Sequence, residues 1–229
     1  MENNISQLEK SLGYSFKNKD LLLQAVTHRS YLNENPDWRL PHNERLEFLG
    51  DAALELVVTE YLYENFPNPE GELTSWRSAL VNADMLSVIS SKFDLNSHIL
   101  LSRGEAKDSG RARQYILANA MEAVIGAVYL DGGYEATKVF ISRYLLPELT
   151  TVLKEKSYKD PKSSLQEEAQ ERTGITPSYE VLENWGPDHM KQFRIGVYLN
   201  KELIGEGVGS SKQEAQQAAA EDALMKKSW

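Results

Sequence analysis

The chain has 229 residues, of which 41% are hydrophobic and 26% charged, so it is long enough for one large domain or two small ones, each with a buried core. It contains no cysteine, which excludes disulfide frameworks, thiolate zinc sites and cysteine nucleophiles and fits a cytoplasmic location. No run approaches the roughly 20 apolar residues of a membrane span, and a formal net charge of −9 predicts that any polyanion is bound through local basic groups or metal ions.

The first two thirds of the chain are predicted to be helical throughout, because no strand-like alternation of useful length occurs there. Apolar residues recur at helical spacing in six segments, which are residues 5–12, 19–27, 43–66, 72–94, 116–130 and 134–154. Turn-rich breaks that contain proline or glycine are found at residues 33–42, 67–71 and 102–111.

The pattern changes after residues 155–161, a charged segment that ends in proline and is predicted to be a linker. Beyond it we expect a helix, three strands and a second helix, at residues 163–173, 178–184, 192–199, 202–209 and 211–227. Ser211 and Glu214 have the spacing of a capping box at the start of the last helix. The sequence therefore predicts an all-helical domain over residues 1–154 and an α-β-β-β-α domain over residues 162–229.

The segment Asn43-Glu44-Arg45-Leu46-Glu47-Phe48-Leu49-Gly50-Asp51-Ala52 carries an unusual pattern of charge. Read as a helix, it places Glu44, Glu47 and Asp51 within one narrow arc, and Glu55 follows one turn later. The rest of this helix is almost entirely apolar, which predicts that it is buried on its other sides. Clustered carboxylates beside a core repel one another and are costly to desolvate, so the arc predicts a divalent metal site.

A second helix, residues 116–130, has Glu122 as its only charged residue. Asn119 lies three residues before Glu122 and shares its face, and we expect Gly126 to keep that face open. If this face meets the acidic arc of residues 43–66, three carboxylates and one amide carbonyl form an oxygen-only site. Such ligands suit Mg²⁺ or Mn²⁺ rather than zinc.

Structural explanations of the same polar residues stay open at this point. A buried Glu122 can instead cap a neighbouring helix or pair with an arginine, for which Arg77 and Arg111 are the candidates. The sequence offers no convincing Ser-His-Asp triad. We therefore expect His28 and His42 to lie at helix ends or in packing contacts rather than to act as general bases.

These motifs resemble a known family. Residues 43–52 are similar to the signature of the ribonuclease III family, and residues 116–133 are similar to its second acidic motif. Three further segments agree with the family in order and spacing: Thr27-His28-Arg29-Ser30-Tyr31, Glu70-Gly71-Glu72-Leu73-Thr74 with Arg77, and Leu80-Val81-Asn82. Residues 160–228 resemble a double-stranded-RNA-binding domain, so the resemblance covers essentially the whole chain.

The resemblance implies a multidomain α and α+β fold, in which an all-α ribonuclease III endonuclease domain is followed by an α-β-β-β-α double-stranded-RNA-binding domain. It implies a Mg²⁺-dependent endoribonuclease, with Mn²⁺ as a substitute, that cleaves double-stranded RNA to 5′-phosphate and 3′-hydroxyl ends with short 3′ overhangs. Its substrates would be structured precursors of rRNA and mRNA. The family acts as a homodimer in which the two signature helices pack together.

The resemblance also implies roles for individual residues. By position, the metal ligands are Glu47, Asp51, Asn119 and Glu122. Asp51 and Glu122 are the expected catalytic residues, while Glu44 and Glu70 are expected to lie along the same acidic cleft. Phe48 is expected in the dimer contact, with an ordinary core position as the alternative. Metal ions that lower the pKa of bound water remove the need for a protein nucleophile.

One residue of the metal site departs from the family pattern. Most members carry aspartate where this chain has Asn119. An amide carbonyl can still coordinate Mg²⁺, but it brings one negative charge fewer than a carboxylate. We therefore expect weaker metal affinity.

The C-terminal resemblance rests on Ser164-Leu165-Gln166-Glu167, Pro177-Ser178-Tyr179, Gly186-Pro187-Asp188-His189 and residues 207–220. Domains of this kind read the shape of about 16 base pairs through two minor grooves and the phosphates between them. By position, the implied RNA-binding residues are Gln166 and Gln170 in the first helix, Pro187 and His189 in the loop between the first two strands, and Ser211, Lys212, Gln213 and Gln216 at the start of the last helix.

This second domain is acidic for an RNA-binding domain. The family usually carries several basic residues at the start of the last helix, whereas this chain has Lys212 but Gln213 and Gln216. Residues 160–229 hold 8 basic and 12 acidic residues, a net charge of −4. We expect weak binding with a shallow salt dependence, or, as the alternative, a domain that packs on protein. Two rival functions are considered. One is a non-catalytic double-stranded-RNA-binding protein. The other is an enzyme acting on small phosphates, a function that would leave the second domain without a role.

Overall fold

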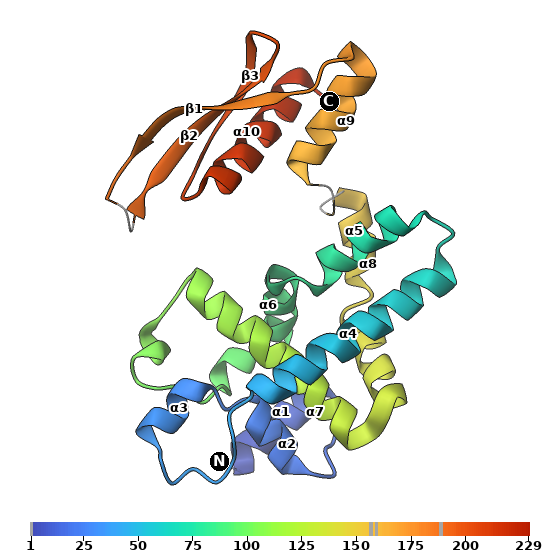
Figure 1. Cartoon of the computed structure of the whole chain (residues 1–229). Coiled ribbons are helices and arrows are strands. Elements are labelled where there is room, and N and C mark those ends of the chain that lie inside the picture. Colours follow the sequence, from blue (N-terminus) through green and yellow to red (C-terminus); the bar gives the residue numbers. More distant parts are fainter. Residues whose placement is uncertain (1, 156–157, 159, 188–189) are drawn as a thin grey trace. The chain divides into compact units, whose positions relative to one another are not determined.

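The computed structural model of the chain describes residues 2–155, 158, 160–187 and 190–229. It divides into two compact units, residues 1–158 and 159–229, each with its own hydrophobic core (Figure 1). The first unit is helical and the second is an α-β-β-β-α unit, which confirms the predicted fold class. The predicted linker, residues 155–161, falls partly outside the described ranges. Among the described helices, none combines the length and the apolar character needed to cross a bilayer.

The described residues of the first unit form eight α-helices and two short 3-10 helices. The α-helices are α1 (Glu2–Leu12), α2 (Lys19–Ala25), α3 (Arg29–Glu34), α4 (Glu44–Asn65), α5 (Glu70–Val81), α6 (Ala83–Lys92), α7 (Arg111–Tyr144) and α8 (Glu148–Glu155). The 3-10 helices are η1 (Leu95–Ser97) and η2 (Glu105–Lys107). The bounds of α1, α2 and α4 lie close to those predicted from apolar spacing.

The bounds of three predicted helices differ in the structure. The predicted helix 72–94 is two helices, because Asn82 leaves the helical backbone and its side chain accepts a hydrogen bond from the Met85 amide at 2.9 Å, capping α6. The predicted helices 116–130 and 134–154 become α7 and α8. α7 starts earlier, at Arg111, and continues across a kink at Gly133, where φ is +75°. Apolar periodicity alone does not detect such caps and kinks.

A short helix, α3, lies where the sequence predicts none. Its six residues are too few to show a helical period. The ring of His28 accepts a hydrogen bond from the Ser30 amide at 3.3 Å and so caps this helix. His42 acts similarly at the start of α4, where its Nδ1 accepts from the Glu44 amide at 3.4 Å. Both histidines therefore have the predicted helix-end positions.

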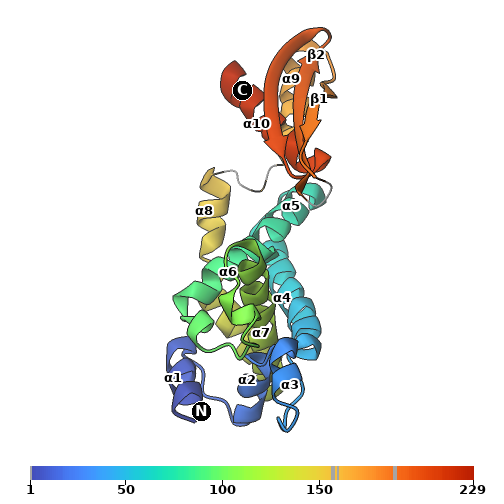
Figure 2. The same cartoon turned by 90° about the vertical axis from the view of Figure 1, so that its left-hand side faces the viewer.

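The centre of the first unit is the crossing of α4 with α7, which form its most extensive helix pair (Figures 1 and 2). At Gly50 an added Cβ would lie 1.8 Å from the carbonyl oxygen of Glu122, and at Gly126 it would lie 2.2 Å from that of Leu46. No side chain larger than hydrogen fits at such a distance. Gly126 therefore does not keep a face of its helix open, as the sequence predicted, but forms the backbone contact with α4.

The second unit contains α9 (Pro161–Thr173), β1 (Ser178–Trp185), β2 (Gln192–Leu199), β3 (Glu202–Gly209) and α10 (Lys212–Lys227). The strands form an antiparallel sheet in the order β1-β2-β3 (Figure 1). Ile195 and Val197 of β2 are buried in a core with alanines of α10. Glycines of β3 let α10 approach closely, since a Cβ on Gly207 would lie 2.2 Å from the Ala219 nitrogen. The Ser211 side chain accepts from the Glu214 amide, as the predicted capping box requires.

The close crossing of α4 and α7 predicts a large cost for one added methyl group. Gly50→Ala should lower the free energy of unfolding by about 1–3 kcal/mol, because two helix backbones must move apart to accommodate it. Gly71→Ala is the matched control, since Gly71 lies in α5 with nothing within 4 Å of an added Cβ. It should gain about 0.5–1 kcal/mol from helix propensity. Urea unfolding measures both, and equal midpoints for Gly50→Ala and wild type would show that the helices do not meet there.

Candidate active site and nucleic-acid interface

The acidic residues of α4 and α7 meet beside the Gly50–Gly126 crossing. Glu47 and Asp51 lie on α4, Glu47 half-buried and Asp51 exposed, and Glu122 lies half-buried on α7. The tight approach of the two backbones holds the Glu122 segment directly against the α4 turn that carries Glu47 and Asp51. The structure thus brings together the two acidic motifs that the sequence separates by some 70 residues.

The electrostatics of these carboxylates show how closely they are grouped. Burial, followed by the charges of Asp51 and Glu47, raises the pKa of Glu122 to about 8. Burial, together with the charges of Glu44 and Asp51, also raises the pKa of Glu47. Within the described residues, no ion pair engages Glu122. Arg77 instead donates to the Thr59 hydroxyl at 2.9 Å, and Arg111 is exposed.

This group of oxygens has the ligand chemistry of a hard divalent cation. Its candidate ligands are the carboxylates of Glu47, Asp51 and Glu122 and the amide carbonyl of Asn119, which lies partly exposed one turn before Glu122. In the part of the chain that the structure describes, no three histidine, aspartate or glutamate side chains already enclose a metal position. Mutual repulsion opposes such a closed arrangement until a cation compensates the charges.

Glu44 and Glu70, which were expected along the same acidic cleft, lie in different places. Glu44, in the first turn of α4, is exposed and lies 3.4 Å from the guanidinium of Arg29 and 3.8 Å from Nδ1 of His42. Its charge contributes to the raised pKa of Glu47, so it belongs to the same acidic surface. Glu70 begins α5, beyond the other end of α4, and neither raised pKa has Glu70 among its causes. Within one chain, the structure does not bring Glu70 to the other carboxylates.

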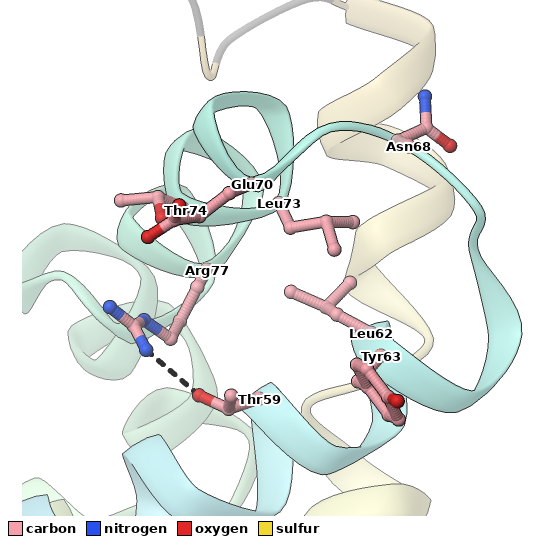
Figure 3. A pocket seen from close by; sticks show the side chains of 8 residues that line it. All are labelled: Thr59, Leu62, Tyr63, Asn68, Glu70, Leu73, Thr74 and Arg77. Carbon is pink, nitrogen blue, oxygen red and sulfur yellow. Dashed lines mark hydrogen bonds between the residues drawn. The ribbon is translucent and has the colours of Figure 1, made fainter.

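Glu70 instead lines a surface pocket of about 420 Å³ between the C-terminal half of α4 and the start of α5 (Figure 3). The lining residues are Thr59, Leu62, Tyr63, Asn68, Glu70, Leu73, Thr74 and Arg77. Leu62 and Leu73 make its floor apolar, while the Arg77–Thr59 hydrogen bond closes one side. Sequence reasoning gave no sign of this pocket, because its two walls come from different helices.

A stripe of exposed apolar residues runs along α4 beside the acidic arc. Phe48 is 81% exposed, Leu56 56% and Tyr63 81%, and helical spacing places all three on one face. The prediction that this helix is buried outside its acidic arc is therefore wrong for the single chain, and so is the alternative that Phe48 is a core residue. A large apolar stripe in water is typical of a surface that binds another molecule.

The predicted RNA-binding residues of the second unit lie on its surface. Gln166 and Gln170 are exposed on α9 and line a shallow pocket of about 340 Å³ with Ser163 and Glu167. Pro187 is exposed in the loop after β1, and His189 lies outside the described residues. At the start of α10, Ser211, Lys212 and Gln213 are exposed, whereas the Gln216 carbonyl accepts a hydrogen bond from the Lys162 ammonium at 2.8 Å. Lys162 is a residue that sequence reasoning missed.

The raised pKa of Glu122 predicts an effect of pH on stability. In the folded protein this carboxyl keeps its proton up to about pH 8, whereas an ordinary glutamate has a pKa of 4.5. The folded state therefore binds more protons between these values, and the contribution of Glu122 to the free energy of unfolding falls as the pH rises from about 5 to about 8. Glu122→Gln should gain stability relative to wild type over this range.

Urea unfolding with EDTA present, at a series of pH values, measures this difference. Glu55→Gln removes an exposed carboxylate of α4 and serves as the control for loss of charge alone. If the difference in free energy of unfolding between wild type and Glu122→Gln does not change with pH over this range, the result would contradict the grouping of these carboxylates.

Comparison with known proteins agrees with this geometry. Residues 18–149 match the family model described as ribonuclease-III-like, and residues 161–227 match that of the double-stranded RNA binding motif. The chain is 47% identical over 222 residues to ribonuclease 3 of Carboxydothermus hydrogenoformans, which covers 96% of this chain and 94% of that protein. It is 46% identical over 225 residues to ribonuclease 3 of Sulfurovum sp., which covers 97% of each.

Solved structures of ribonuclease III nuclease domains are also similar to this chain. A crystal structure of the nuclease domain of ribonuclease III from Campylobacter jejuni is 42% identical with a TM-score of 0.57, and the match covers 63% of this chain and 95% of that one. A second structure of that domain, which describes flexibility in the region involved in its dimer formation, has the same identity and TM-score and covers 62% and 99%. The chain belongs to the ribonuclease III family: it is an endoribonuclease with a helical nuclease domain followed by a double-stranded-RNA-binding domain.

Proposed function

We propose that this chain is a Mg²⁺-dependent endoribonuclease that hydrolyses double-stranded RNA to 5′-phosphate and 3′-hydroxyl ends. Its substrates are structured precursor RNAs of the cytoplasm, including those of rRNA and mRNA. The observation that carries the proposal is the group of uncompensated carboxylates at the α4–α7 crossing, on a nuclease fold joined to an RNA-binding domain. The nuclease domain would span residues 1–154 and the RNA-binding domain residues 162–229, joined by a linker at residues 155–161.

The carboxylates fit a divalent metal ion. Burial, followed by repulsion from Asp51 and Glu47, raises the pKa of Glu122 to about 8, and a divalent cation would remove that repulsion. These three side chains and the carbonyl of Asn119 would hold the metal. When bound, Mg²⁺ supplies an activated water and neutralises charge that develops on the phosphate.

The chain's own residues would position the reaction. Asp51 is exposed and Glu122 half-buried, so the site is open on one side to a phosphodiester and closed on the other by the core. Asn119 would contribute an oxygen without a charge, which predicts weaker metal binding than an aspartate would give. Glu44, paired with Arg29, would keep the acidic surface continuous toward the start of α4.

The second unit would hold the duplex. Gln166 and Gln170 on α9 would contact one minor groove, and the loop that contains Pro187 and His189 would contact the next. The start of α10 would meet the phosphates between them, through Lys212 and through the backbone amides of its first turn. The exposure of the described members of this set supports the proposal.

We further propose that the chain acts as a homodimer through the apolar stripe of α4. Phe48 and Tyr63 are 15 positions apart, about 22 Å along a helix, and Leu56 lies midway between them. A two-fold axis near Leu56 would pack two copies of α4 antiparallel and place Phe48 of one protomer at the pocket beside Tyr63 of its partner. The apolar floor of that pocket suits an aromatic ring (Figure 3).

The same arrangement gives Glu70 a role in the acidic cleft. Glu70 lines the pocket that would receive the partner's Phe48, and Phe48 lies one residue after Glu47. Dimerisation would therefore bring Glu70 of one protomer toward the acidic arc of the other. This explains why a single chain leaves Glu70 apart from the carboxylates with which the sequence grouped it.

Substitution of Glu122 separates cleavage from binding. Glu122→Gln keeps the shape of the side chain but removes a charge from the proposed metal site, so it should lower the rate of duplex cleavage in Mg²⁺ by roughly 100-fold or more. Binding of duplex RNA, measured in EDTA, should stay at the wild-type level. Glu135→Gln removes an exposed carboxylate elsewhere on α7 and should cleave normally. Normal cleavage by Glu122→Gln would refute the assignment of the site.

Truncation of Phe48 tests the proposed dimer. Phe48→Ala removes the aromatic anchor of the interface and should weaken self-association by roughly 30-fold or more. Analytical ultracentrifugation over a range of concentrations measures this, with Val88→Ala, on the exposed surface of α6, as the control. A wild-type chain that stays monomeric at all concentrations would contradict the dimer, and unchanged association of Phe48→Ala would contradict this interface.

A further inference from the structure

Several basic side chains of the second unit are paired with neighbouring carboxylates. Among the described residues of 160–229, ion pairs are formed by Arg172 with Glu168 at 2.7 Å, Arg194 with Glu183 at 3.5 Å, Lys226 with Asp222 at 2.6 Å and Lys227 with Glu202 at 2.7 Å. Such pairs reduce the charge that a phosphate would meet. An acidic domain that binds RNA must therefore rely on its remaining cations.

Lys162, near the start of α9, is held in place by neutral groups. Its ammonium donates to the side-chain carbonyl of Gln216 at 2.8 Å and lies 5.2 Å from the centre of the Tyr179 ring. Burial, with a smaller effect of Asp160, raises the pKa of Tyr179 to about 12, so the phenol is neutral. The partners of Lys162 thus fix its position without cancelling its charge.

This ammonium lies at the N-terminal part of α10, which the proposed function places against RNA phosphates. Gln216 lies four residues after Lys212, on the same face of the helix, so the ammonium of Lys162 lies one turn from Lys212. A second contact, from the Gln217 amide to the Asp160 carboxylate at 3.3 Å, joins the start of α9 to the same part of α10.

One carboxylate, Asp160, is close enough to matter. Its oxygens accept hydrogen bonds from the Ser163 amide at 3.0 Å and from Gln217. Within the described residues, no carboxylate oxygen comes within 4.0 Å of the Lys162 ammonium. Asp160 therefore caps α9 and leaves Lys162 a net cationic group.

We propose that Lys162 contacts an RNA phosphate at the start of α10, where it supplies from α9 the positive charge that Gln216 lacks. The proposal rests on the proposed binding of double-stranded RNA. In the proposed function, α9 contacts a minor groove through its glutamines. The inference adds a phosphate contact, which α9 makes through Lys162 at the start of α10.

Binding of duplex RNA as a function of salt tests this contact. The full-length chain would be titrated by fluorescence anisotropy against an RNA duplex of about 25 base pairs, longer than the roughly 16 that one domain spans. EDTA would prevent cleavage, and KCl would vary from about 50 to 200 mM. Lys162→Gln should bind roughly 10-fold more weakly, and the slope of log K against log salt should become shallower by about one unit.

Two further variants make the result specific. Lys201→Gln removes a cation at the β2–β3 turn, which lies at the opposite end of α10 because Glu202 pairs with Lys227, and it should bind like wild type. The double variant Lys162→Gln/Gln216→Lys exchanges the two side chains, so the positive charge moves from α9 to α10 within the same contact. It should restore both the affinity and the slope.

The outcomes separate the inference from the proposed function. Wild-type affinity and slope for Lys162→Gln would overturn the inference alone. A loss of affinity at an unchanged slope, or an exchange that restores neither quantity, would show that Lys162 only holds α9 against α10, which also overturns it. Failure of the wild-type chain to bind any duplex would contradict the proposed function itself.

Discussion

The direct contact between the backbones of α4 and α7 places the carboxylates of Glu47, Asp51 and Glu122 beside one another. Gly50 and Gly126 have no room for a side chain, so the two helices approach more closely than any larger residue permits. Apolar residues on both sides, such as Leu54 and Met121, bury the rest of the crossing. The core thereby holds Glu122 against Glu47 and Asp51 in spite of their repulsion. Burial and, after it, the charges of these two neighbours raise the pKa of Glu122 to about 8.

Two features of the isolated protomer stand out on α4. The carboxylates of Glu47 and Asp51 lie grouped with that of Glu122, and Phe48, Leu56 and Tyr63 are exposed to water. Both features cost free energy in the isolated protomer, and the apolar stripe lies next to the carboxylates on α4. Under the proposed function, a metal ion and a second copy would each remove one of these costs.

The sequence predicted those features that depend on local pattern. A charged arc on an apolar helix identified Glu47 and Asp51, and a lone charge identified Glu122. The sequence did not reveal that Gly50 forms the backbone contact with α7, because a contact between backbones does not affect the spacing of apolar residues. It also missed Lys162, whose partner Gln216 is 54 positions away. Apolar spacing alone did not separate the expected dimer contact of Phe48 from a core position, since a stripe that a second copy would cover has the same pattern as one buried in a core.

Cleavage of RNA by the purified wild-type chain decides whether the carboxylates at the α4–α7 crossing form a metal-dependent nuclease site. A long end-labelled RNA duplex would be incubated with the protein in Mg²⁺ or in EDTA. We expect cutting to short duplexes with 5′-phosphate ends in Mg²⁺ and none in EDTA, which would show that Asn119 suffices beside the three carboxylates. Binding without cutting, restored neither by Mn²⁺ nor by Asn119→Asp, would contradict this expectation and identify a non-catalytic RNA-binding protein.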